Sequence, residues 1–521
     1  MTLPLRTTVL LATLALSSCG GSVTLDSTHA TGDASNGDAG AGGASSATAG
    51  VGGGAGTAGA AQGGCGPVTG SVDVTHVTAT AAVSGPEDLS SWQLTAFPLD
   101  PSSGGPKEAT VTGPGAFQID GIPCGATFAL RMRGGMFGDT FHGPADTWLV
   151  TESRTLDLGY SILGRAGAPL GPTTLPLMTG VDAHITGLSP SATANYGEWY
   201  CPGSGLAGIG PEGSPMSGEW NEPIHFPVLA PLPQDDDIWL TQLDVGPPGA
   251  RVVTAGKASG VTFVPDQYAP VDLALTPPPT ATFVTTVSTD DFIATVLAAT
   301  PAATAWYTEV FVGAQPGSQP DATTLAATLA QYDFKPAPGP LTATLTFGNP
   351  FPSTTFALVA SAGHTAQVVA FAPDGMAFQD SVTTVLVLAY DAAVGATIVP
   401  LVSAPTNVSV DGVVPTDSYV AVDLTPTLAW SPPTLGVAAL YGVSVTELVP
   451  ADGGVLQADP KIVSFATTHR SLRIPTGVLQ TGHRYTVHVS ATSSPADLEH
   501  HPFRPSLPMG YADMALPMFI P

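Results

Sequence analysis

The sequence predicts an all-β protein, in which tandem β-sandwich modules follow a disordered Gly/Ala-rich tether. Two observations lead to this fold class. The chain has 60 Gly and 51 Pro among 521 residues, about a fifth where roughly 12% is usual, and these residues separate short segments rich in Thr, Val and Ala. Apolar residues make up 43%, enough for buried cores, whereas long helical periodicity is absent. The length predicts about three to four domains.

The charge balance excludes one class of partner. Only 11% of the residues are charged, and 41 acidic residues outnumber 14 Lys and Arg, which gives a formal net charge of -27. A surface that binds nucleic acid needs basic side chains to neutralise phosphates. We therefore expect no nucleic-acid partner.

Residues 1–19 have the pattern of a signal peptide. Arg6 precedes a mostly apolar run at 9–16, which is far too short to span a membrane. The run ends in Leu-Ser-Ser-Cys at 16–19, which resembles the lipobox of bacterial lipoproteins and implies lipidation of Cys19. An ordinary secretory signal with an incidental cysteine is the alternative. Gly20, in place of Asp, resembles the sorting signal for the outer membrane, so the resemblance implies a lipid-anchored protein of the bacterial outer membrane.

Residues 20–64 form the predicted tether. Of these 45 residues, 15 are Gly and 11 are Ala, and none is aromatic. Such a segment cannot bury enough apolar surface to offset its ordering entropy. As a Gly-rich coil it would reach roughly 35–40 Å from the membrane anchor.

The first folded module is predicted over 66–160. Residues 113–130 read GPGAFQIDGIPCGATFAL, with Phe117 and Ile119 on one face of a strand and Phe128 and Leu130 on one face of the next. This pattern resembles the signature of carboxypeptidase-regulatory-like sandwich domains. In that family the module is a scaffold or a binding appendage without catalytic residues.

Two further β-rich domains are predicted over 165–278 and 280–402. Three consecutive prolines at 277–279 separate them, because proline cannot donate to a strand ladder. A short helix is expected over 323–332. Pieces such as 238–243 and 347–352 are similar to segments of large uncharacterised outer-membrane lipoproteins of the myxobacterial type, a likeness that implies no activity.

Residues 404–521 are similar to a fibronectin type III domain. Trp430 matches the core tryptophan of that fold, and Leu479, Gly482 and Tyr485 match the tyrosine corner. The resemblance implies that Trp430 and Tyr485 are structural core residues. In the strand that begins at Tyr485, alternation places His488 on the outward face.

Three cysteines remain after lipidation of Cys19. Cys65 and Cys124 both belong to the first module, and an exported chain meets an oxidising compartment. We therefore expect a Cys65–Cys124 disulfide. Three free thiols, or Cys201 in place of one partner, are the alternatives.

Neither a metal site nor a cofactor is predicted. His500 and His501, preceded by Asp497 and Glu499, could form a weak surface metal site, but a solvated loop is the simpler interpretation. The acidic runs at 235–237 and 290–291 could donate oxygens to calcium. Each lacks the spaced pattern of a calcium loop, so a capping turn is the alternative there.

Aromatic residues suggest a carbohydrate platform, with core packing as the alternative. Trp199, Tyr200 and Trp220 lie in a Gly/Pro/Glu-rich region and could stack on sugars if they were exposed. Because sandwich cores also need large aromatic side chains, core packing is the simpler interpretation.

The leading functional hypothesis is therefore non-enzymatic. We expect a lipid-anchored surface protein with a structural or interaction role, whose modules bind extracellular protein or polysaccharide partners, because no catalytic motif occurs in the sequence. The alternative is a secreted glycan- or peptide-processing hydrolase with an unrecognised active site in 165–400. Convergence of His184, His225 and His364 with carboxylates would favour that alternative.

Overall fold

A computed structural model describes most of the chain from residue 66 onward. The described residues are 66–134, 146–164, 180–189, 194–201, 206–213, 218–225, 237–246, 249–261, 268–322, 326–337, 339–451 and 454–521. Strands dominate these residues, so the all-β prediction is confirmed. The predictions for the signal peptide, the tether, Cys19 and Cys65 lie outside the described residues.

The first unit contains β1–β11 and two short 3₁₀ helices. Its elements are β1 (Val68–Ser71), β2 (Asp73–Val77), β3 (Ala82–Pro86), η1 (Leu89–Ser91), β4 (Gln93–Pro98), η2 (Pro101–Ser103), β5 (Lys107–Glu108), β6 (Thr110–Gly113), β7 (Ala116–Ile119), β8 (Phe128–Arg133), β9 (Asp146–Thr151), β10 (Thr155–Asp157) and β11 (Tyr160–Leu163). They form a β10-β1-β7-β6 sheet, a β11-β2-β3 sheet and one end of a much longer sheet. All four residues that the motif pattern places facing inward, Phe117, Ile119, Phe128 and Leu130, are buried in one core.

The second unit contains β12–β18. Its strands are β12 (Gly180–Leu188), β13 (Ala194–Cys201), β14 (Leu206–Gly213), β15 (Gly218–His225), β16 (Ile238–Gly246), β17 (Gly249–Ala258) and β18 (Tyr268–Ala274). A β15-β12-β18 sheet forms one layer, and β13, β14, β16 and β17 belong to the long sheet.

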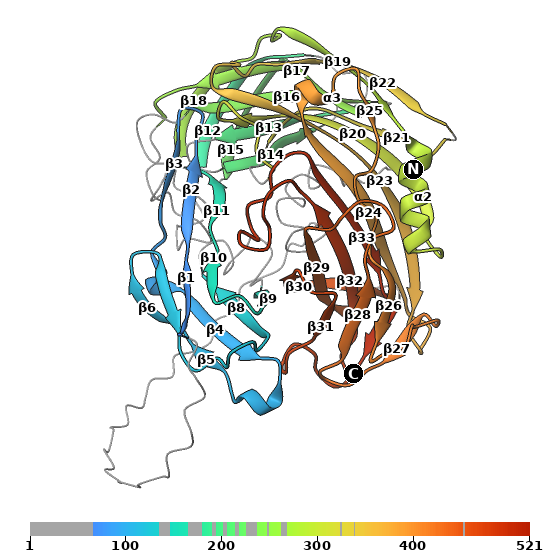
Figure 1. Cartoon of the computed structure of the whole chain (residues 1–521). Helices are drawn as coiled ribbons and strands as arrows, with labels where there is room; N and C mark the ends of the chain where they lie inside the picture. Colours follow the sequence, from blue (N-terminus) through green and yellow to red (C-terminus); the bar gives the residue numbers. More distant parts are fainter. Residues whose placement is uncertain are drawn as a thin grey trace, which may run out of the picture.

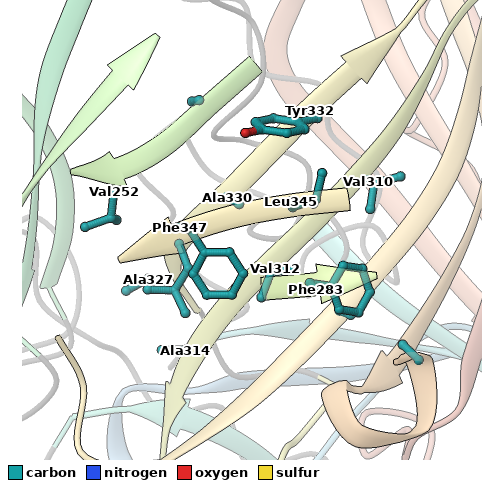
Figure 2. Packing of buried hydrophobic residues seen from close by; sticks show 14 of the residues in the cluster. Val252, Phe283, Val310, Val312, Ala314, Ala327, Ala330, Tyr332, Leu345 and Phe347 are labelled. Atoms are coloured by element: carbon teal, nitrogen blue, oxygen red, sulfur yellow. The ribbon is translucent and has the colours of Figure 1, made fainter. Parts of the chain in front are cut away.

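The third unit contains β19–β25 and two helices. Its elements are β19 (Thr280–Val287), α2 (Thr289–Ala299), β20 (Thr304–Pro316), β21 (Ala327–Phe334), β22 (Leu341–Gly348), β23 (Phe356–Phe371), β24 (Ala377–Ala389), α3 (Tyr390–Ala393) and β25 (Thr397–Ile398). A β22-β19-β25 sheet covers the long-sheet strands β20, β21, β23 and β24. In Figure 2, Phe283 of β19 and Phe347 of β22 lie opposite Val310 and Val312 of β20, within one apolar cluster.

The fourth unit contains β26–β34. Its strands are β26 (Thr406–Val410), β27 (Tyr419–Ala421), β28 (Thr427–Ser431), β29 (Leu440–Ala451), β30 (Val455–Thr467), β31 (Ser471–Arg473), β32 (Tyr485–Ser493), β33 (Met509–Ala515) and β34 (Met518–Ile520). A β26-β28-β31 sheet faces the other six strands across a core that includes Trp430 and Tyr485. The Tyr485 hydroxyl accepts a hydrogen bond from the Gln480 backbone N–H at 3.0 Å, which is the contact of a tyrosine corner.

One sheet of 18 strands runs through all four units. The strand pairs β17–β21, β24–β33 and β30–β9 join the second unit to the third, the third to the fourth and the fourth to the first. In Figure 1, β9 of the first unit lies next to β30 of the fourth. Because unpaired edge strands expose backbone donors and acceptors, these pairings close edges that separate sandwiches would leave open.

The long sheet supplies side chains to different cores from its two faces. Trp148 and Val150 of β9 lie in the core of the fourth unit, whereas Leu149 between them lies in the core of the first. Likewise Leu240 of β16 lies in the core of the second unit, and Trp239 lies in the cluster of the third. Since successive side chains of a strand point to opposite faces, one strand stabilises two units at once.

The helix expected over 323–332 is wrong. The segment from Ala327 onward is β21, which pairs with β20 on one side and with β17 at one end. Both of its faces are buried over most of its length, and backbone pairing on a doubly buried sheet outweighs the helix propensity of its alanines. Helix α2, which the sequence patterns did not predict, carries Asp290 and Asp291 in its first turn.

Candidate functional site

Gly66 is the first residue that the structure describes, and Arg154 holds it. The Arg154 guanidinium donates to the carbonyl oxygens of Gly66, Ile122 and Pro123; the contacts to the last two are 3.0 and 3.4 Å. A guanidinium is well suited to this task because its donors are rigidly arranged. Through Arg154, a force applied to the chain at Gly66 therefore acts on the turn at 122–124 as well as on β1.

Cys124, in the same turn, is disulfide-bonded. The alternative of three free thiols is therefore wrong. The partner of Cys124 lies outside the described residues, so the Cys65–Cys124 pairing stays a prediction. Cys201, the alternative partner, ends strand β13 in the second unit.

A groove of about 540 Å³ lies on the first unit. It is lined by Pro86, Glu87, Asp88, Leu89, Ser90, Val111, Gly113, Pro114 and Gly115. Two strands that are each at the edge of their sheet, β3 and β6, supply residues to it. Gly115 has a φ of +61°, and a side chain there would meet Pro86 Cβ at 2.8 Å, so glycine is required where the two walls approach.

The groove is mostly apolar and contains the carboxylate of Glu87, which has a raised pKa. Val111 is 52% exposed. Burial raises the pKa of Glu87, and the nearby side chains of Trp92 and Tyr160 offset only part of this rise. The groove therefore combines apolar contact area with an acidic group, a combination suited to binding but not by itself to catalysis.

A buried charged cluster lies between the third and fourth units. The His488 imidazole lies between Asp380 of β24, at 2.9 Å from Nε2, and Asp513 of β33, at 3.0 Å from Nδ1. The Thr486 hydroxyl also donates to Asp380, at 2.7 Å. Figure 1 shows β24, β33 and β32 side by side. His488 does lie on the face of β32 that points away from the core of the fourth unit, but β24 of the third unit covers it there, so its side chain is largely buried.

The pKa values of this cluster indicate an ionised bridge. Burial opposes the positive charge of His488, but Asp380 and Asp513 together raise the pKa of His488 well above its ordinary value. Burial likewise opposes the charge of Asp380, yet His488 and the neighbouring donors lower the pKa of Asp380. At neutral pH an imidazolium therefore lies between two carboxylates.

A second charged cluster joins the first and fourth units. Asp157 accepts from His501 Nδ1 at 2.9 Å and lies 3.7 Å from Arg504, while Arg504 donates to the carbonyl oxygen of Asp73 at 2.8 Å. His500 instead pairs with Asp497 at 2.8 Å. The adjacent imidazoles thus contact different carboxylates, and no group of three or more metal-ligating side chains occurs in the described part of the chain.

Of the histidines that could have indicated a hydrolase, His184 and His225 lie on paired strands of the β15-β12-β18 sheet, whereas His364 lies in the long sheet. His184 of β12 lies 3.0 Å from Asp272 at the surface, whereas His364 of β23 is fully buried and bonded to Thr308 at 3.1 Å. Burial lowers the pKa of His364 to about 4, so this imidazole is neutral at physiological pH. His225 ends β15, and its side chain lies outside the described residues.

The carbohydrate-platform hypothesis is wrong for Tyr200. This residue is 0% exposed and its ring lies 6.0 Å from Phe351 and 6.5 Å from Phe356. The side chains of Trp199 and Trp220 lie outside the described residues.

The acidic runs considered for calcium have other partners where they are described. Asp237 accepts from Lys257 and Ser259, at 2.9 and 2.6 Å; Asp235 and Asp236 lie outside the described residues. Asp290 accepts from the Gly339 backbone N–H at 3.0 Å, and Asp291 accepts from Ser288 at 2.6 Å.

Buried acids in the second and third units were missed by the sequence patterns. Glu198 of β13 accepts from the Thr328 backbone N–H at 3.0 Å, and burial raises the pKa of Glu198 to about 7. Glu309 of β20 is only 3% exposed. A signal was available for Glu309, since it is the one charged residue in the otherwise mostly apolar run 304–314.

The fold and these clusters define a multi-unit all-β protein with one shared sheet. Comparison with known protein families finds no family model that matches this chain, and comparison with curated proteins finds no match either. No helix in the described part of the chain is long and apolar enough to cross a membrane.

Proposed function

We propose that this chain is a lipid-anchored protein of the bacterial outer membrane with a structural and interaction role. In this proposal Cys19 carries the lipid, residues 20–64 act as the tether, and the four β-rich units form one body that binds extracellular protein or polysaccharide partners. The identification of the first unit as carboxypeptidase-regulatory-like and of the fourth as fibronectin type III-like is part of the same proposal.

The observation that carries the proposal is the continuity of the long sheet across the four units. Main-chain pairs at β17–β21, β24–β33 and β30–β9 connect units that are distant in sequence. Such a body keeps its surfaces in fixed relative positions, as a display scaffold requires. The charged clusters around His488 and Asp157 support the proposal, because each joins two units.

The start of the folded part, where the proposed tether would join it, supports the same interpretation. Arg154 holds the Gly66 carbonyl, and in this proposal Cys124, which is disulfide-bonded, pairs with Cys65 at the same point. A disulfide stabilises a domain by about 2–4 kcal/mol, and a Cys65–Cys124 bond would also tie the segment before β1 to the turn at 122–124. An anchored protein needs such reinforcement at the point where its anchor joins the folded part.

Metabolic labelling with palmitate tests the anchor. The wild-type chain and a Cys201→Ala control should both incorporate label and sediment with membranes, whereas Cys19→Ala should do neither. Label and membrane association that persist in Cys19→Ala would contradict the proposed anchor.

The groove on the first unit is the surface we propose for partner contact. Arrayed polysaccharides and purified outer-membrane proteins would be tested for binding to the unlipidated Cys19→Ala chain. Val111→Asp in the groove should abolish binding, whereas Val413→Asp, at a valine that is 68% exposed elsewhere, should not. Hydrolysis of peptidoglycan or a polysaccharide by the chain, abolished by a histidine substitution, would instead establish the enzymatic alternative.

A further inference from the structure

Two carboxylates face each other across neighbouring strands in the third unit. Glu309 of β20 and Asp333 of β21 are direct partners in the antiparallel register. Directly opposite side chains share one face of the sheet, and their Cβ atoms are about 4.5–5.5 Å apart. Like charges in this position repel each other, so the pair destabilises the sheet unless something lies between the carboxylates.

The surroundings of Glu309 offer its carboxylate little compensation. Glu309 Oε2 is fully buried and has no hydrogen-bond partner. On the other side of Glu309, its partner on β23 is Gly363, and a side chain built there would meet Val385 Cγ2 at 2.6 Å. The apolar side chain of Val385 therefore lies over Gly363. In the described part of the chain, neither Glu309 nor Asp333 forms an ion pair with Lys, Arg or His.

Both carboxylates bind protons more tightly than usual. Burial, followed by the charge of Asp333, raises the pKa of Glu309 well above its ordinary value. Burial raises the pKa of Asp333 to about 6. Near neutral pH the pair is therefore stabilised when a positively charged group lies between the two carboxylates. A bound cation would reduce their repulsion as a proton does.

We propose that Glu309 and Asp333 together bind a divalent cation with Ca²⁺ chemistry. Carboxylate oxygens are hard ligands that suit Ca²⁺, which also accepts backbone carbonyls and water and tolerates irregular geometry. No imidazole or thiolate is paired with either carboxylate in the described residues, so the donor set does not suit a softer metal. Asp333 as a whole residue keeps surface in contact with solvent, while the neighbouring groups crowd its carboxyl enough to raise its pKa.

This pair differs from the other acidic groups that were considered for calcium. Asp290 and Asp291 lie at the surface of α2 with donors already in place, and Asp237 is paired with Lys257. Among the described residues, Glu309 is the one whose buried carboxylate oxygen without a donor lies opposite a second carboxylate. Substitutions at the pair and at these other acids should therefore have different effects on a metal titration.

Terbium luminescence tests the proposal directly, because Tb³⁺ replaces Ca²⁺ and is excited by nearby aromatic rings. Tyr307 lies two residues before Glu309 on the same strand, and thus on the same face at about 6.5 Å along the strand. The Trp306 ring packs against Tyr307 with centroids 4.9 Å apart. Titration of the full chain with Tb³⁺ should give saturable emission that Ca²⁺ displaces.

Variants of the two carboxylates, compared with a surface control, test whether the metal binds between them. Glu309→Gln and Asp333→Asn should each reduce the emission at least tenfold, whereas the surface variant Asp290→Asn/Asp291→Asn should retain it. Ca²⁺ should raise the thermal unfolding midpoint of the wild type, and EDTA should reverse this shift; the midpoint of Glu309→Gln should not respond. Because Glu309→Gln removes a buried charge, it should fold at least as well as the wild type, as checked by circular dichroism.

Two outcomes would overturn the proposal. Emission that is absent from the wild type, or equally strong in Glu309→Gln, would show that the pair does not bind the metal. A wild-type unfolding midpoint that depends on pH but is identical in Ca²⁺ and in EDTA would show that the pair only shares a proton.

Discussion

Asp380 of β24 accepts a hydrogen bond from His488 of β32 at 2.9 Å, although 108 residues separate them in the chain. The two residues belong to different units, and Asp513 of β33 holds the other imidazole nitrogen at 3.0 Å. The three side chains are largely buried, with exposures of 13%, 16% and 10% for Asp380, His488 and Asp513. The imidazolium therefore adds a buried charged contact to the strand pairing that joins the third and fourth units.

Replacing His488 should weaken this junction strongly. His488→Ala leaves two carboxylates buried without their cation, and loss of one partner from a buried ion pair costs about 3–5 kcal/mol. The urea unfolding midpoint should fall accordingly. His469→Ala, at an imidazole outside this cluster, should leave the midpoint nearly unchanged. Equal effects of the two substitutions would contradict a special role for His488.

The same cluster predicts a defined pH window for stability. The pKa of His488 is raised above 6.5 in the folded state, so its contribution is complete below that pH and is lost as the pH rises through the folded value. The pKa of Asp380 is lowered below 3.8, so its contribution is complete above that pH and is lost as the pH falls through the lowered value. Unfolding midpoints measured from pH 3 to 10 should decline at both ends, and His488→Ala should flatten the alkaline decline.

Glu198→Gln should stabilise the protein at alkaline pH. Burial raises the pKa of Glu198 from 4.5 to about 7, so the folded state binds the proton more tightly than the unfolded chain. Stability should therefore fall as the pH rises from 4.5 to 7, by about 3 kcal/mol. Glutamine keeps an oxygen for the Thr328 N–H and removes the charge. Unfolding curves at pH 5 and pH 8 test this, and a wild-type-to-variant difference that is the same at both pH values would refute it.

Tyr485→Phe should destabilise the fourth unit modestly. The substitution removes the hydroxyl that accepts from the Gln480 N–H and leaves that donor unpaired, which costs about 1–3 kcal/mol. Tyr441→Phe, in the same core, removes a hydroxyl without affecting this bond and is the matched control. Differential scanning calorimetry should show the larger shift for Tyr485→Phe.

The local sequence predicted strand character and much of the core. Alternation and turn residues were sufficient to place Phe117, Ile119, Phe128 and Leu130 in one core, and Trp430 and Tyr485 in another. These properties depend on neighbours in sequence, because period-two alternation decides which side chains share a face. The expected helix over 323–332 was wrong because the pairing of β21 with distant strands was not visible locally.

Tertiary structure alone decided how the units join and which acids are buried. The sequence shows that β32 has an outward face, but not that β24 and β33 bring Asp380 and Asp513 to it. It shows a lone Glu309 in a mostly apolar strand, but not that Asp333 lies opposite. Strand partners are chosen by the free energy of the whole sheet, in which edges distant in sequence pair to satisfy their backbone groups. The burial and pKa of each of these carboxylates follow from that choice.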